Sequence, residues 1–70
     1  MQVLIIEDEL PAANRLVKML EGIDSSIQVV NRIDSVEASV KFLQTDPAVD
    51  LIFMDIQLAD GLSFDILSQV

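Results

Sequence analysis

The run Leu51–Met54 most constrains what this chain can fold into, because four apolar residues lead without interruption into the carboxylate of Asp55. A short run of this kind indicates a β-strand buried on both faces, which is typical of parallel sheets covered by helices. In such sheets, ligands bind at the carboxyl ends of the strands. Asp55 stands at that end, and an Asp60-Gly61 turn signal follows it. Asp55 is therefore the first candidate for a functional residue.

Short apolar and amphipathic segments alternate along the rest of the chain. The run Val3–Ile6 predicts a second buried strand that ends in acid, and the imperfect alternation over 27–33 predicts a strand at the edge of the sheet. Helical patterns separate the strands and imply a parallel α/β sheet with right-handed crossovers. The expected order is a strand over 3–6, a helix from Pro11 to Gly22, a strand over 27–33, a helix capped by Asp34 or Ser35 that ends at Asp46-Pro47, a strand over 51–54, and about two turns of helix from Ser63.

Composition limits the chemistry and the partners open to this chain. It has 70 residues with no cysteine and no histidine, so a metal site here must use oxygen ligands. Twelve acidic and four basic residues give a net charge of −8, which disfavours contact of this segment with nucleic acid or an anionic membrane surface. No apolar run is long enough to span a bilayer, and the first residues lack the pattern of a signal peptide, so we expect a cytoplasmic location.

Acidic residues end two of the expected strands. If the strands over 3–6 and 51–54 are adjacent and parallel, Glu7, Asp8 and Asp55 emerge at one edge of the sheet, where ionised carboxylates repel unless a counter-ion is present. A hard divalent cation such as Mg²⁺ takes oxygen ligands, and it would allow Asp55 to attack a phosphoryl group. Each acid alone is equally consistent with a helix cap or a partner of a helix dipole. Their joint pattern favours a metal-assisted phosphoryl site.

These motifs resemble the receiver domain of two-component response regulators. The resemblance covers all 70 residues and is carried by Val3–Glu9, Leu51–Asp55 and Asp60-Gly61. The segment Met54–Phe64 is most similar to receivers that precede LytTR-type DNA-binding domains. The resemblance implies a flavodoxin-like sheet in which the second strand lies beside the first and the first beside the third. It identifies residues 1–70 as the N-terminal part of an incomplete receiver domain.

The same resemblance implies a role for each acid. Asp55 would be the phosphoacceptor for a histidine kinase, in a phosphorelay that ends in transcription regulation through a DNA-binding output domain outside this segment. Asp8 would be a direct Mg²⁺ ligand, Glu7 a ligand through water, and Gln57 a ligand through its backbone carbonyl. Such a domain is not an enzyme, because it assists only its own phosphorylation and dephosphorylation. Many receivers have proline where this chain has Ala59, a difference that affects the stiffness of the loop more than its chemistry.

Receivers also carry a hydroxyl residue after a fourth strand and a lysine after a fifth, and both contact the phosphoryl oxygens. Residues 1–70 contain neither, so we expect this piece alone to be unable to switch. The exposed third strand and the short last helix also predict self-association, with pairing of strand edges or exchange of elements between copies.

Other functions fit the pattern less well. A dinucleotide-binding half-fold needs a glycine-rich first turn, whereas Glu7-Asp8-Glu9 would repel a pyrophosphate. An aspartyl-nucleophile phosphatase has Asp-x-Asp after its first strand, where this chain has Glu7-Asp8-Glu9. A nucleotidyl site of the topoisomerase-primase type has Asp-x-Asp on its third strand, where this chain has Asp55-x-Gln57. The phosphatase and a non-catalytic interaction module remain as alternatives. The carboxylate that binds a phosphoryl mimic distinguishes them: Asp55 in a receiver, a first-strand acid in a phosphatase.

Overall fold

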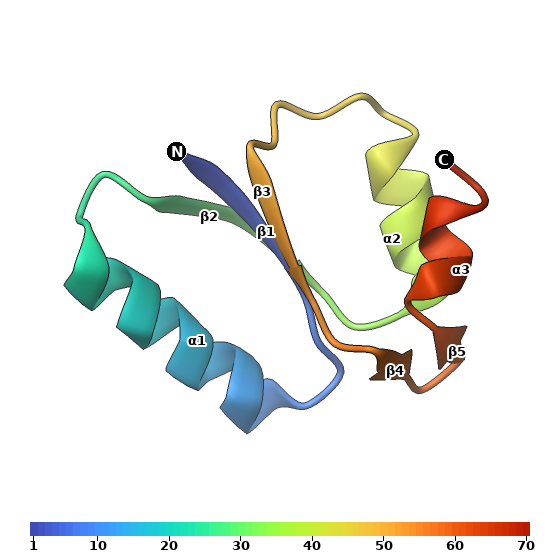
Figure 1. Ribbon diagram of the computed structural model, residues 1–70, viewed down its shortest axis with the longest axis horizontal. Coiled ribbons are helices and arrows are strands. Elements are labelled where there is room, and N and C mark those ends of the chain that lie inside the picture. Colours follow the sequence, from blue (N-terminus) through green and yellow to red (C-terminus); the bar gives the residue numbers. More distant parts are fainter.

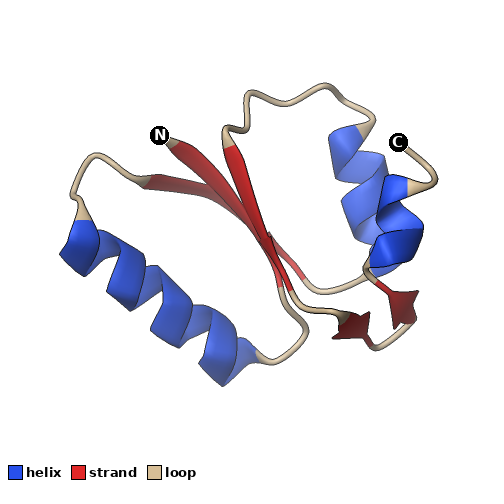
Figure 2. Cartoon of the chain, in the orientation of Figure 1, coloured by secondary structure: helices blue, strands red, loops and turns tan.

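Strand β1 (Gln2–Ile6) forms the centre of a three-stranded parallel sheet in the order β2-β1-β3. Strands β2 (Gln28–Ile33) and β3 (Leu51–Met54) lie on either side of it, and both run parallel to β1. The computed structural model describes all of residues 1–70, and Figure 2 shows the sheet between its helices. The predicted α/β class and strand order are confirmed, as is the edge position of β2.

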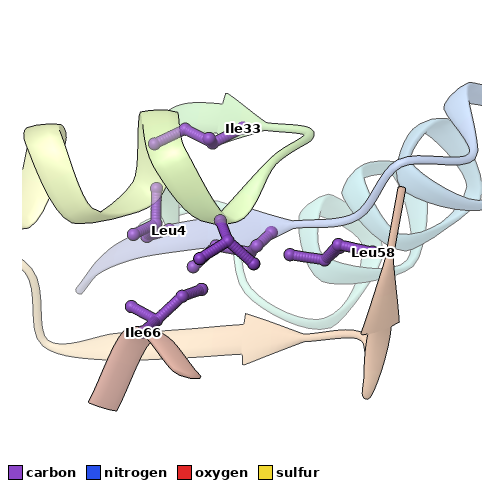
Figure 3. Packing of buried hydrophobic residues seen from close by; sticks show 6 residues of the cluster. Leu4, Ile33, Leu58 and Ile66 are labelled. Carbon is purple, nitrogen blue, oxygen red and sulfur yellow. The ribbon is translucent and has the colours of Figure 1, made fainter. Parts of the chain in front are cut away.

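Helices cover both faces of the sheet. Helix α1 (Leu10–Ile23) lies on one side, and α2 (Val36–Leu43) and α3 (Phe64–Leu67) lie together on the other (Figure 1). Successive residues of β1 point to opposite faces, so the strand contributes to two separate cores. On the α1 side the core consists of Val3, Ile5, Ala13 and Leu20. On the other side it consists of Leu4, Ile6, Ile33, Val36, Leu58 and Ile66, whose side chains converge in Figure 3.

The strand that is buried on both faces is β1. Its residues Val3–Ile6 are at most 1% exposed, whereas Leu51 in β3 is 42% exposed and the rest of that strand is only half-buried. Ile52 and Met54 pack against the core on one face of β3 and Phe53 packs against the core on the other, so both faces are covered, but the predicted full burial of Leu51–Met54 is wrong. The reason is its position, since β3 is hydrogen-bonded to β1 alone and its other edge is open.

The start of α2 follows the predicted capping, whereas the ends of α1 and α2 differ from the prediction, and α2 ends at Leu43 rather than at Asp46-Pro47. Ser35 caps α2 by accepting the backbone N–H of Ala38 at 3.1 Å, which decides between Asp34 and Ser35. Gly22, predicted to end the first helix, lies in its last turn, and the helix continues to Ile23. None of the helices combines the length and the apolar character needed to cross a membrane.

The segment after Asp55 is more ordered than the predicted loop. Two-residue strands β4 (Gln57–Leu58) and β5 (Gly61–Leu62) form an antiparallel hairpin, and Leu58 is only 3% exposed because it packs into the core beside Ile66. Strands this short are below the length at which alternation is detectable. The last helix spans a single turn of four residues, shorter than predicted.

Candidate functional site

The structure brings three acidic side chains to one edge of the sheet. Glu7 and Asp8 follow β1 and Asp55 follows β3, and one carboxylate oxygen of each lies within 4.8 Å of the others. Because β1 and β3 are parallel, with Ile6 opposite Met54, their carboxyl ends coincide. The three acids therefore form a cluster, called the acidic cluster below.

Backbone hydrogen bonds hold the acidic cluster beyond the ends of the strands. The N–H of Asp55 donates to the Ile6 carbonyl at 2.9 Å, and the N–H of Glu7 donates to the Ile33 carbonyl at 2.9 Å. The ladder thus continues one residue past β1 and past β3, and it ties the acidic cluster to all three strands of the sheet. The position of the acids is set by the sheet itself, which is more rigid than a free loop.

The carboxyl group of Glu7 shows the electrostatic cost of this arrangement. The N–H of Glu9, which donates to Glu7 at 3.1 Å, lowers the pKa of Glu7, but burial and the neighbouring Asp55 and Asp8 carboxyls together raise it above 4.5. The hydrogen bond from the Glu9 N–H therefore does not fully offset burial and the negative charge of the neighbouring carboxyls. A cation bound among the three oxygens would remove that cost.

The donor set fits a hard divalent cation. All three side chains offer carboxylate oxygens, and the chain has no histidine or cysteine to recruit a softer metal. Gln57 lies two residues past Asp55, at the first position of β4, with an exposed side chain.

Two cavities adjoin the acidic cluster. One of about 200 Å³ lies between α1 and β3 and is lined by Leu16, Phe53 and the cluster acids Glu7 and Asp55. The other, of about 340 Å³, is lined in part by Asp8, Arg32 and Asp34.

Asp60 has a contact that sequence reasoning missed. Its Oδ1 accepts the N–H of Val36 at 2.8 Å and its Oδ2 accepts the N–H of Glu37 at 3.1 Å, so a residue of the β4–β5 hairpin caps α2. These two backbone hydrogen bonds hold the pKa of Asp60 below 3.8. In the sequence Asp60 is only half of a turn signal, and no pattern links it to a helix start 24 residues earlier.

Three curated proteins are similar to this chain. The Fimbriae Z protein of Salmonella typhimurium is 36% identical over 67 residues, which cover 96% of this chain and 31% of that protein. The Sensory transduction protein LytT is 33% identical over 67 residues in Bacillus cereus and 32% over 66 residues in Bacillus anthracis, with 94% of this chain and 26% of LytT covered in both. The chain thus spans between a quarter and a third of the length of these relatives.

No family model matches the chain, and no solved structure matches it. The similarities relate the chain to proteins that include one named for sensory transduction.

Proposed function

We propose that this chain belongs to the phosphoacceptor receiver domain of a two-component response regulator, in which Asp55 accepts a phosphoryl group from a histidine kinase. The observation that carries this proposal is the acidic cluster, with carboxylate oxygens of Glu7, Asp8 and Asp55 within 4.8 Å at the carboxyl edge of a parallel sheet. Ligands of open α/β sheets bind at that edge. The similarity to LytT, a sensory transduction protein, supports the same assignment.

In this proposal Asp8 binds Mg²⁺ directly, Glu7 binds it through water, and Gln57 contributes its backbone carbonyl. The oxygen-only donor set and the raised pKa of Glu7 support a cation at this position. Bound Mg²⁺ would supply positive charge between the Asp55 carboxylate and the oxygens of the incoming phosphoryl group.

The transfer is a single displacement at phosphorus. A carboxylate oxygen of Asp55 attacks the phosphorus of the kinase phosphohistidine, and the new P–O bond forms as the P–N bond breaks. The electron pair of the P–N bond stays on the imidazole nitrogen, which takes a proton from solvent and leaves as neutral histidine. The protein's contribution is to place the nucleophile and its neighbouring acids, because phosphoryl transfer depends on positioning and charge stabilisation.

The signal would pass to an output domain outside residues 1–70, and the resemblance of Met54–Phe64 to receivers of the LytTR type points to a DNA-binding one. The net charge of −8 argues that the DNA contact belongs to that domain, because phosphate backbones are bound by basic residues. A histidine kinase as partner and a cytoplasmic location follow from the same proposal.

Binding of beryllofluoride, a phosphoryl mimic, tests the proposal and separates it from the phosphatase alternative. With Mg²⁺ present, we expect a bound fluoride signal in ¹⁹F NMR that is lost in Asp55→Asn. Asp50→Asn is the matched control, because Asp50 precedes β3 and Asp55 follows it. A signal that survives Asp55→Asn and disappears in Asp8→Asn would support a first-strand nucleophile and contradict the receiver assignment.

A further inference from the structure

We propose that Asp60 is a positioning residue for the acidic cluster, because its carboxylate fastens the β4–β5 hairpin, which begins at Gln57 two residues after Asp55 in the sequence, to the start of α2. This inference rests on the proposed function, in which the Gln57 carbonyl is a metal ligand. It assigns to Asp60 an effect on Mg²⁺ affinity although Asp60 lies outside the acidic cluster.

The contact between Asp60 and α2 joins two segments far apart in the sequence. The N–H groups of Val36 and Glu37 belong to the first turn of α2, where no helix carbonyl is available to accept them, and both donate to the Asp60 carboxylate. A negative charge is favourable at this end of a helix. Ser35 accepts the next free N–H, from Ala38. Helix α2 is therefore capped by two side chains, that of the adjacent Ser35 and that of the distant Asp60.

The hairpin that carries Gln57 is held at three places. At its base, the N–H and the hydroxyl of Ser63 donate to the Ile56 carbonyl at 2.9 and 3.2 Å. In its middle, Leu58 is buried in the core. At its tip, the Asp60 carboxylate accepts two hydrogen bonds from the first turn of α2.

Gln57 pairs with Leu62 inside this hairpin, so the direction of its carbonyl depends on the orientation of the whole hairpin. Without Asp60 the hairpin would keep its attachments at Ser63 and Leu58 but lose the one at its tip, so the direction of the Gln57 carbonyl would be held less firmly. Mutation of residues that orient metal ligands typically lowers metal affinity by about 10–100-fold.

Calorimetric titration of the 70-residue chain with Mg²⁺ alone tests the inference. We expect Asp60→Ala to raise the Mg²⁺ Kd by about tenfold, the lower end of the range for residues that orient metal ligands. Ser35→Ala is the matched control, because it removes a cap from the same helix without touching the hairpin, and it should leave the Kd unchanged. Asp60→Asn keeps one oxygen acceptor and should give an intermediate Kd, which provides the answer if Asp60→Ala does not fold.

Amide hydrogen exchange supplies a second readout that a purely structural role would not move. Because coupling between two sites is reciprocal, Mg²⁺ should slow exchange at the N–H groups of Val36 and Glu37 in the wild type and leave it unchanged in Asp60→Ala. Wild type that binds Mg²⁺ with the same Kd as both Asp60 variants would overturn this inference and leave the proposed function intact. Wild type with no saturable Mg²⁺ binding would overturn both.

Discussion

Glu7 and Asp55 follow neighbouring parallel strands and hold carboxylate oxygens within 4.8 Å of each other. Burial and this proximity raise the pKa of Glu7 above 4.5, in opposition to the Glu9 N–H, which lowers it. A raised folded-state pKa means that Glu7 stabilises the fold fully below pH 4.5, and that this contribution is lost as pH rises through the folded pKa.

The first prediction concerns Asp55→Asn. Loss of the Asp55 charge removes one of the causes that raise the pKa of Glu7, so that pKa should fall. The free energy of unfolding at neutral pH should rise, by less than about 1 kcal/mol because solvent screens the cluster. NMR titration of the Glu7 carboxyl and denaturant unfolding measure the two effects. Asp50→Asn is the control for the Glu7 pKa alone, because the Asp50 carboxylate accepts a hydrogen bond from the Gln2 N–H. An unchanged Glu7 pKa would contradict this account.

The second prediction is that Mg²⁺ stabilises the chain against heat. A ligand that binds only the folded state at about a hundredfold excess over its Kd adds about 2.7 kcal/mol to the free energy of unfolding. The melting temperature should rise with MgCl₂ and return to its original value with a chelator. Asp8→Ala should abolish the rise, and NaCl at matched ionic strength separates binding from screening. A rise of equal size in Asp8→Ala would contradict a site built on that residue.

The third prediction compares the two glycines. Gly22 lies in α1, and a Cβ there would meet no atom within 4 Å beyond its chain neighbours and the backbone of its own helix, so Gly22→Ala should add about 0.5–1 kcal/mol to the free energy of unfolding. Gly61 adopts φ +151°, a conformation that side chains disfavour, so Gly61→Ala should lower that free energy by about 1–2 kcal/mol. Denaturant unfolding measures both. Changes of the same sign would contradict the local conformations described here.

The fourth prediction concerns the open edge of β3. Unpaired N–H and C=O groups on that edge, next to the 42% exposed Leu51, favour pairing with another strand, so we expect residues 1–70 to self-associate at micromolar concentration. Salt should strengthen association by screening the charge of −8. Leu51→Lys should weaken it, whereas Leu10→Lys, at a 63% exposed position on α1, should not. Sedimentation velocity measures the states, and a compact wild-type monomer would contradict the prediction.

The fold was predictable because its main signals are local. Apolar runs such as Val3–Ile6, separated by amphipathic helices, determine a parallel α/β order without reference to distant residues. The meeting of Glu7 and Asp55 follows from that order, since parallel strands that lie side by side end at one edge.

What escaped prediction depends on contacts between distant segments. β3 is exposed because, among these residues, no strand pairs with its second edge. The apolar side chains of Leu51–Met54 do not indicate that this edge is open. The hairpin depends on Leu58 entering a core completed by Ile66, and the cap from Asp60 depends on where α2 comes to lie. Two-residue strands and a lone Asp-Gly pair carry too little pattern to indicate these contacts.

The acidic cluster joins residues 7 and 8 to residue 55 through the pairing of β1 with β3, with β2 and two helices between them in the sequence. During synthesis on the ribosome, Glu7 and Asp8 therefore emerge long before the carboxylate that completes their site. Pairing of parallel strands this far apart in the sequence is slow compared with the formation of a local helix, so the acidic cluster is complete only late in folding. Cation binding by the nascent chain would consequently mark the moment at which the first and third strands meet.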